Sequence, residues 1–251
     1  MSTTDPRKVA LVTGAGSGIG RATADEFVRR GYATVLIDWE DEKGRQAEAQ
    51  LRPSGECIFI HCDVTDDAAV RQAIDRAVSL YGRLDAAFHS AGVAVQQGKP
   101  TAECSMEYWT QVIATDLTGI FSCMRHAIPH MLEAGGGSIV NCASMAGLVG
   151  APNVPANVAA KHAVVGLTKA AALEYARQNI RVNVVCPGIT DTGMFRRAVT
   201  PSMLGPLAET VPMGRFAQPA EIAAVVLALC DESMGFLTGQ AIAVDGGFTA
   251  R

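Results

Sequence analysis

One stretch near the start of the chain decides the fold: TGAGSGIG, residues Thr13 to Gly20. It follows a short apolar run, Val9 to Thr13, and leads into a segment with helical periodicity, Gly18 to Arg30. A phosphate group can approach the backbone closely only where side chains are absent, and the N-terminus of a helix offers it N–H donors and positive potential. The stretch therefore predicts a strand, a glycine-rich phosphate-binding turn and a helix, in that order.

A carboxylate in the next apolar run adds to this motif. The run Thr34 to Asp38 ends in Asp38, about twenty residues beyond the glycine-rich turn, which is the spacing of a dinucleotide-binding unit. A carboxylate at this position accepts hydrogen bonds from ribose hydroxyls and repels a 2′-phosphate. Ala15, Ser17 and Trp39 supply no basic side chain that would neutralise such a phosphate. The sequence therefore predicts a site for NAD(H) in preference to NADP(H).

Short apolar runs rich in Val, Ile and Ala alternate with longer helix-like segments along the chain, which is typical of βαβ units around a buried parallel sheet. We therefore predict one α/β domain over residues 1–251, a Rossmann fold with a doubly wound, seven-stranded parallel sheet and helices on both faces. The predicted strands are Val9–Thr13, Thr34–Asp38, Cys57–Cys62, Leu84–His89, Ser138–Ala143, Ile180–Cys186 and Ala241–Val244. The predicted helices are Gly18–Arg30, Asp41–Leu51, Asp66–Tyr81, Met106–Glu133, Val154–Gln178 and Pro219–Leu229.

One connection is much longer than the others, the segment from Pro187 to Gln218. It is rich in Pro and Gly and also carries large apolar side chains between Met194 and Met213. Long connections in compact domains are usually lids or binding loops, and ligands bind beyond the carboxyl ends of the strands. We therefore predict a substrate lid at about residues 187–218.

Composition and charge exclude several other classes of protein. Apolar residues make up 49% of the chain and charged residues 18%, which indicates a globular protein with a large core. A net charge of −4 with scattered Lys and Arg gives no footprint for nucleic acid, and no apolar run is long enough to cross a membrane. Seven Cys without a CxxC pair, and His without acidic or Cys partners at ligand spacing, predict no metal site. The polar start resembles no secretion signal, so we expect a cytoplasmic protein.

Over about residues 8 to 248 the sequence resembles the short-chain dehydrogenase/reductase family. The glycine spacing is the family's, and further family motifs follow in order: Asp63-Val64, Ser90-Ala91-Gly92 with Ser in place of Asn, Pro187-Gly188-Ile189 with Thr192, and Asp245-Gly246-Gly247. The resemblance implies a homo-oligomer, a tetramer or a dimer, and a set of cofactor contacts. These contacts are Gly14, Ser17, Gly18, Ile19, Gly20, Asp38, Trp39, Asp63, Val64, Ser90, Ala91, Gly92, Lys161, Pro187, Gly188, Ile189 and Thr192.

The resemblance also implies a catalytic set, from which the sequence departs at two positions. Family members use a Ser that holds the substrate oxygen, a Tyr that exchanges its proton, and a Lys four residues after the Tyr that lowers the Tyr pKa and binds the nicotinamide ribose. Ser144 and Lys161 match the Ser and the Lys, but Asn157 stands at the Tyr position. Asp116 stands where the family has an Asn that completes a proton relay. Because an amide does not ionise, Asn157 cannot replace a phenol as proton donor.

Asp116 is the residue best able to compensate for the missing phenol. It can fall near Lys161 and form an ion pair with it, and burial of such a pair would shift both pKa values. Whether Asn157 is a natural or an engineered residue stays open. Departures at three separate positions, Ser90, Asp116 and Asn157, favour a divergent family member over one laboratory substitution.

Three functions stay open on these residues. The first is an NAD(H)-dependent oxidoreductase that interconverts an alcohol and a ketone through an atypical or impaired site. The second is an NAD-binding protein without redox turnover, and the third is a lyase or isomerase on the same fold. A small, largely apolar substrate is expected from the lid and from apolar residues near the site, which are Val93, Val95, Met145, Leu148 and Val149.

Overall fold

Seven strands form the centre of the structure, a computed structural model that describes residues 7–94 and 98–250. They lie in the order β3-β2-β1-β4-β5-β6-β7, and every neighbouring pair is parallel. The order reverses between β1 and β4, so the sheet is doubly wound and the predicted fold class is confirmed. The strands are β1 (Val9–Thr13), β2 (Ala33–Asp38), β3 (Cys57–His61), β4 (Ala86–His89), β5 (Gly137–Cys142), β6 (Ile180–Pro187) and β7 (Ala241–Val244).

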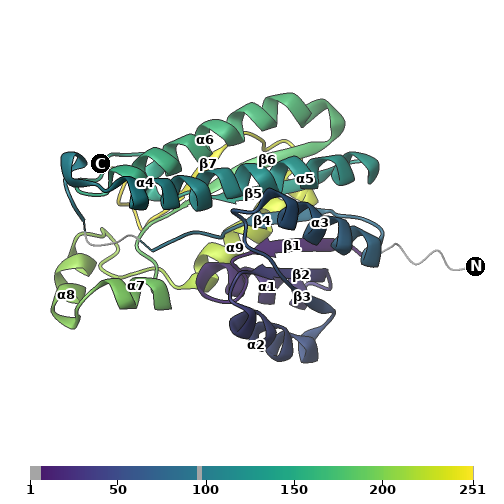
Figure 1. Ribbon diagram of the computed structural model, residues 1–251, viewed down its shortest axis with the longest axis horizontal. Helices are drawn as coiled ribbons and strands as arrows, with labels where there is room; N and C mark the ends of the chain where they lie inside the picture. The colour runs from purple at the N-terminus through teal and green to yellow at the C-terminus, as the bar shows by residue number, and fades with distance from the viewer. Residues whose placement is uncertain (1–6, 95–97, 251) are drawn as a thin grey trace, which may run out of the picture.

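Helices cover both faces of the sheet (Figure 1). The buried apolar clusters show that α1, α2 and α9 pack on one face, while α3, α5 and α6 pack on the other. Each crossover between strands contains at least one helix, as parallel pairing requires. The helices are α1 (Gly18–Arg29), α2 (Asp41–Leu51), α3 (Asp67–Tyr81), α4 (Met106–Val112), α5 (Gly119–Glu133), α6 (Pro155–Tyr175), α7 (Gly193–Ala198), α8 (Pro201–Glu209) and α9 (Pro219–Cys230).

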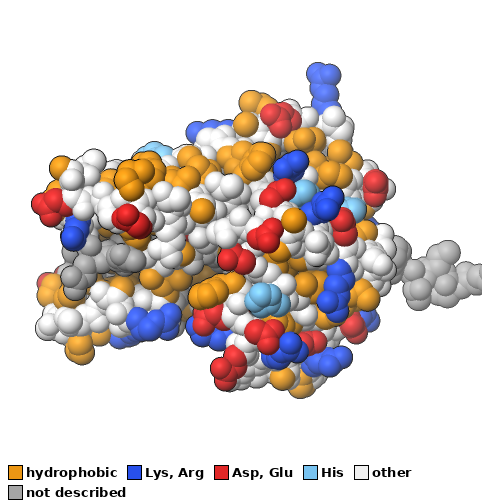
Figure 2. Space-filling model, viewed as in Figure 1, with side chains coloured by type: hydrophobic (Ala, Val, Ile, Leu, Met, Phe, Trp, Pro, Cys, Tyr) orange, Lys and Arg blue, Asp and Glu red, His pale blue; other side chains and the backbone are white. Residues whose placement is uncertain are grey.

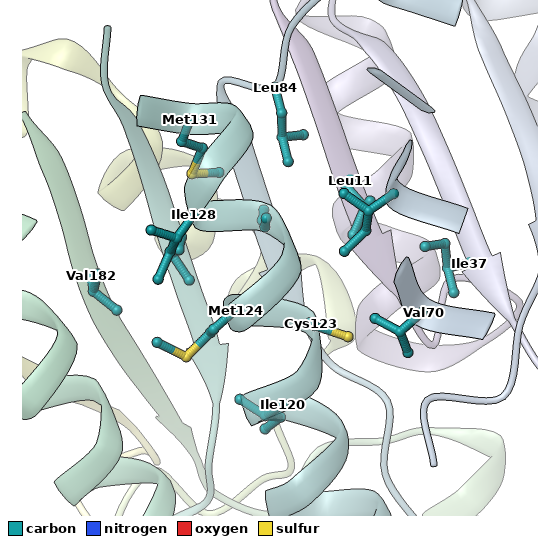
Figure 3. Close-up of a cluster of buried hydrophobic side chains, with 14 of the residues drawn as sticks. Leu11, Ile37, Val70, Leu84, Ile120, Cys123, Met124, Ile128, Met131 and Val182 are labelled. Atoms are coloured by element: carbon teal, nitrogen blue, oxygen red, sulfur yellow. The ribbon is translucent and has the colours of Figure 1, made fainter. Parts of the chain in front are cut away.

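The larger buried apolar cluster lies between the sheet and the layer formed by α3, α5 and α6. Figure 3 shows Leu11 of β1 and Ile37 of β2 near Val70 of α3, with Ile120 and Cys123 on α5 alongside. Every residue of β1 and β2 is buried, because helices cover both faces of these strands. The carboxyl ends of the strands are therefore fixed, and the segments that follow them carry most of the predicted site residues.

The segment Met106–Glu133, predicted as one long helix, is divided into three parts. α4 ends at Val112, and a π-helical segment, Ile113–Thr118, separates it from α5. A π turn widens the helix locally and changes the direction of its side chains, and such turns are frequent at functional sites. This one contains Asp116, which is buried.

The predicted lid is more regular than a Pro- and Gly-rich loop suggests, because it contains α7 and α8. Its two ends are tied together: Thr190 and Ala217 form a β-bridge, and the Ala217 N–H donates to the Ile189 carbonyl (3.0 Å). All residues of both helices are described, and none of them is buried. In Figure 1 the two helices stand apart from the sheet.

The remaining differences from the sequence predictions are short. The strand expected from Leu84 begins at Ala86, and the helix expected from Asp66 begins at Asp67, because the Asp66 carboxylate caps it by accepting from the N–H groups of Ala68 (3.0 Å) and Ala69 (3.1 Å). Six of the seven Cys are buried free thiols, and Cys104 is half-buried.

Charges of both signs are mixed over the face shown in Figure 2, with no broad area of one sign. Within residues 7–94 and 98–250, no helix is both long and apolar enough to cross a membrane. In that same described part, no three His, Cys, Asp or Glu side chains gather into a group that could hold a metal ion.

Candidate active site

The glycine-rich turn lies between β1 and α1, against the segment that follows β4. The Thr13 hydroxyl oxygen accepts hydrogen bonds from the backbone N–H groups of Ser90 (3.0 Å) and Ala91 (3.1 Å). Gly14 has a φ of +67°, and a Cβ there would lie 3.1 Å from the Ala91 backbone. A Cβ at Gly20 would overlap the Gly14 carbonyl oxygen. The turn therefore presents bare backbone at the start of a helix, as close contact with a phosphate requires.

Asp38 ends β2 beside this turn, and both of its carboxylate oxygens are held. One accepts from the Gly16 N–H (2.8 Å) and the other from the Glu40 N–H (2.9 Å). The next residue, Trp39, is 67% exposed. Lys43 on α2 is a nearby basic residue four positions beyond Trp39, and its ammonium binds the Glu40 carboxylate (2.5 Å). The carboxylate of Asp38 is thus fixed next to the turn.

The segment after β6 reaches the same turn. The Cγ2 methyl of Thr192 lies 3.3 Å from the position that a Cβ would take at Gly18. A Cβ at Gly188 would lie 2.7 Å from the Asp245 Cα, so the C-terminal motif packs directly on the Pro187–Ile189 segment. The structure therefore brings together the glycine-rich turn, Asp38, the Ser90–Gly92 segment and Thr192.

Asp63 and Val64 follow β3, which is separated from β1 by β2. Asp63 accepts hydrogen bonds from the N–H (2.9 Å) and the hydroxyl (2.8 Å) of Thr65. Val64 is buried, and its Cγ2 lies 2.7 Å from the Cβ position of Gly119, where α5 begins. Asp63 and Val64 therefore lie on the Asp38 side of the site, where the Cys62 N–H donates to the Asp38 carbonyl. Ser17 and Ile19 lie at the start of α1.

The predicted ion pair between Asp116 and Lys161 is confirmed. Asp116 Oδ2 lies 3.1 Å from Lys161 Nζ, and the two residues are 1% and 7% exposed. Burial is the largest influence and opposes the charge on Lys161, but the attraction of Asp116, its hydrogen bond and the effects of neighbouring groups together raise the pKa of Lys161 above its ordinary value. Lys161 Nζ also donates to the Cys142 carbonyl oxygen (3.2 Å), and the Val93 N–H donates to Asp116 Oδ1 (2.9 Å).

Ser144 and Asn157 lie between Asp116 and Lys161 in the chain. Ser144 follows β5, and its hydroxyl oxygen accepts from the Ala146 N–H (3.1 Å). The short turn after it packs on α6, since a Cβ at Gly147 would lie 2.7 Å from the Lys161 carbonyl oxygen. Asn157 lies one helical turn before Lys161 on α6 and is 9% exposed. Among the described residues its carboxamide has no hydrogen-bond partner, which leaves it available to a ligand.

A buried polar network behind the site was missed by the sequence analysis. His89 ends β4, and its Nδ1 lies 2.8 Å from Asn141 Oδ1 on β5, while Asn141 Nδ2 donates to the Thr168 hydroxyl (2.9 Å). Burial lowers the pKa of His89 to about 4, so the ring is neutral near pH 7. The sequence signal for this network is a polar residue, His89 or Asn141, at or next to the end of each of two largely apolar strands. His89 immediately precedes Ser90, so this network anchors the segment that contacts Thr13.

The apolar residues expected to line a substrate pocket have different surroundings. Val93 packs on a small cluster formed by Val112, Ala156 and Ala160, and Leu148 packs on the main core. Met145 is half-buried and Val149 is exposed, while Val95 lies outside the described residues. Next to them is a pocket between the β4–α4 connection and the start of α6, lined by Lys99, Glu103, Cys104, Ser105, Tyr108, Asn153 and Pro155. Its polar lining was not expected from the sequence.

Comparison with known proteins supports the reading of these motifs. The family model described as enoyl-(acyl carrier protein) reductase matches residues 14–249. The 2,5-dichloro-2,5-cyclohexadiene-1,4-diol dehydrogenase of Sphingobium indicum is 41% identical over 246 residues, which cover 97% of each chain. The cyclohexanol dehydrogenase of an Acinetobacter species is 39% identical over 252 residues, which cover 100% of this chain and 98% of the relative.

Solved structures agree with this relationship. A single-residue variant of actinorhodin polyketide ketoreductase with NADPH superposes with a TM-score of 0.93 at 35% identity, and the match covers 100% of each chain. Levodione reductase superposes with a TM-score of 0.90 at 32% identity, covering 97% of this chain and 98% of that one. Sequence motifs, sheet order and relatives all point to the same conclusion: this chain belongs to the short-chain dehydrogenase/reductase family.

Proposed function

We propose that this protein is an NAD(H)-dependent oxidoreductase that interconverts an alcohol and a ketone on a small, largely apolar substrate. The observation that carries the proposal is that the glycine-rich turn after β1, Ser144 after β5 and Lys161, which donates to the last residue of β5, all lie at the carboxyl edge of one parallel sheet. Two relatives are named for alcohols on a six-membered carbon ring, which supports a cyclic alcohol as substrate. Members of the short-chain dehydrogenase/reductase family carry the same motifs in the same order along the chain.

The residues present fit a nicotinamide dinucleotide. The bare backbone of the turn would hold the pyrophosphate, since a Cβ at Gly14 or Gly20 would fill the space that the backbone now takes. Asp38, fixed by two N–H groups, would accept hydrogen bonds from the adenosine ribose. When bound, the nicotinamide exchanges a hydride with the substrate carbon that bears the oxygen.

The chain's own part in the reaction is to position the substrate oxygen with hydrogen-bond donors. The Ser144 hydroxyl and the Asn157 carboxamide can both donate a hydrogen bond to that oxygen, and Lys161 supplies an ammonium nearby. Asn157 can neither give up nor take up a proton, so we propose an atypical, slow site in which solvent donates the proton during ketone reduction and accepts it during alcohol oxidation. The same feature favours a second candidate, an NAD-binding protein without redox turnover.

Two features of the surroundings belong to the proposal. Segment 187–218 would act as a lid. Its ends are joined by the Thr190–Ala217 bridge, and no residue of α7 or α8 is buried. Assembly into a homo-oligomer is supported by large apolar side chains that stay exposed on the outer helices, among them Met106, Phe121 and Leu173. A cytoplasmic location completes the proposal.

The test has two stages. NADH binding is measured first by fluorescence, and NADH absorbance is then followed with a panel of cyclic alcohols with oxidised cofactor and of cyclic ketones with NADH. Binding with turnover on at least one cyclic compound is the expected result. Binding without any turnover would overturn the oxidoreductase proposal and favour the second candidate, while no binding would overturn both.

A further inference from the structure

The two positions at which the catalytic set departs from the family are linked by one charge. Asp116 provides a carboxylate 3.1 Å from the Lys161 ammonium, and Asn157 lies one helical turn before Lys161 on α6. We propose that Asp116 is a positioning residue that offsets the charge of Lys161, so that the surroundings of Asn157 carry little net charge and suit a residue that does not ionise. This inference rests on the site of the proposed function and specifies how that site differs from the family's.

Asp116 is held so that it cannot turn away from Lys161. Its other oxygen, Oδ1, accepts from the Val93 N–H (2.9 Å), and a Cβ at Gly92 would lie 3.4 Å from both carboxylate oxygens. The carboxylate is therefore enclosed by the segment after β4 on one side and by Lys161 on the other. Asp116 lies within the π-helical segment Ile113–Thr118, whose widened turn sets the direction of its side chain.

Lys161 is equally constrained. Of its three ammonium hydrogens, one is directed to Asp116 and one to the Cys142 carbonyl oxygen (3.2 Å), so a single donor is left for a further partner. The pair is almost entirely buried, and water does little to screen its two charges from each other or from Asn157. For an anion at the Asn157 side chain, the attraction of the ammonium is opposed by the repulsion of the carboxylate that lies 3.1 Å from it.

The residue that suits position 157 therefore depends on whether position 116 carries a negative charge. An anion at position 157, such as a phenolate, would be stabilised by a free Lys161 but only weakly by one that is already neutralised. An opposite charge within a few ångströms lowers an acid's pKa by about 1 to 3 units, and this is the effect that Asp116 removes. In the present chain the substrate oxygen is consequently held by neutral hydrogen-bond donors instead of being stabilised as an alkoxide.

A spectroscopic titration tests the inference without cofactor or turnover. A phenol is placed at the site in two variants, N157Y and D116N/N157Y, and its ionisation is followed by tyrosinate absorbance. The matched variants N157F and D116N/N157F supply the signal of the chain's own tyrosines for subtraction. We expect the phenol to titrate at least about one pH unit lower in D116N/N157Y than in N157Y. Equal midpoints, or a lower midpoint in N157Y, would overturn the inference.

A third variant guards against misfolding of D116N/N157Y, in which Lys161 loses its counter-ion. In D116N/K161M/N157Y both charges are gone, so its phenol should titrate within a few tenths of a pH unit of the N157Y midpoint. A midpoint more than one unit higher would show that Lys161 keeps its influence despite Asp116, which contradicts the proposal. Because none of these titrations needs turnover, their failure leaves the proposed function standing, and an absence of turnover leaves the inference standing.

Discussion

The carboxylate of Asp38 accepts a hydrogen bond from the Gly16 N–H at 2.8 Å, which fixes an acidic group at the edge of the glycine-rich turn. A 2′-phosphate on the adenosine ribose would meet this charge, and Lys43, the nearby cation, is engaged by Glu40. We predict that NADH binds at least about tenfold more tightly than NADPH, or about 1.4 kcal/mol. Fluorescence titrations of both cofactors check this, with D38A as the matched variant in which the preference should shrink. Equal affinities in the unaltered chain would contradict it.

The ends of segment 187–218 are tied together at Thr190 and Ala217, while α7 and α8 between them bury no residue. We predict that amide hydrogens of α7 and α8 exchange fast in the free protein and become protected when NADH and a cyclic alcohol bind. Hydrogen exchange with mass spectrometry measures this, with α5 as the internal reference. Protection that stays unchanged across α7 and α8 would show that the segment is not a lid.

His89 makes the fold sensitive to acid. Burial depresses its pKa to about 4 from the ordinary 6.5, so the folded protein prefers the neutral ring and the unfolded chain binds the proton more readily. The stabilising contribution is present above pH 6.5 and is lost as the pH falls toward 4. At 1.36 kcal/mol per pKa unit it amounts to about 3 kcal/mol. Urea unfolding from pH 7 to pH 4 should show this loss, and H89Q should flatten the decline within that window. An equally steep decline in H89Q would refute the assignment.

A large increase in turnover should require changes at both positions, 116 and 157. We predict that D116N/N157Y raises alcohol oxidation by about 10² to 10⁴ over the unaltered chain, the usual contribution of general acid–base catalysis. N157Y should gain much less, because its phenol faces a neutralised Lys161. D116N alone should gain nothing, since it has no phenol. Initial rates with the best cyclic alcohol measure all three, and an N157Y rate equal to that of the double variant would contradict the prediction.

Much of the fold was predictable because its signals are local. β1, the glycine-rich turn and Asp38 are each marked by residue type and spacing, and burial of both sheet faces makes the strands apolar throughout. The ion pair between Asp116 and Lys161 could also be anticipated, because both residues fall at family positions of the site.

The parts that sequence did not reveal depend on tertiary structure. The π-helical segment Ile113–Thr118 has no pattern distinct from the α-helices around it, because packing selects the widened turn. The contacts of Val93 N–H and of the Cys142 carbonyl are made by backbone atoms, which every residue type carries. α7 and α8 were missed because their short sequences, with Gly205 and Pro206 inside α8, resemble a loop.

Whether this site transfers a hydride is decided most directly by isotope transfer. The unaltered protein is incubated with NADH carrying deuterium on both positions of the nicotinamide C4 and with a mixture of cyclic ketones, and the alcohols formed are analysed by mass spectrometry. The account predicts at least one alcohol that carries a single deuterium on its carbinol carbon, even if turnover is slow. Bound cofactor with no deuterium in any alcohol would contradict it.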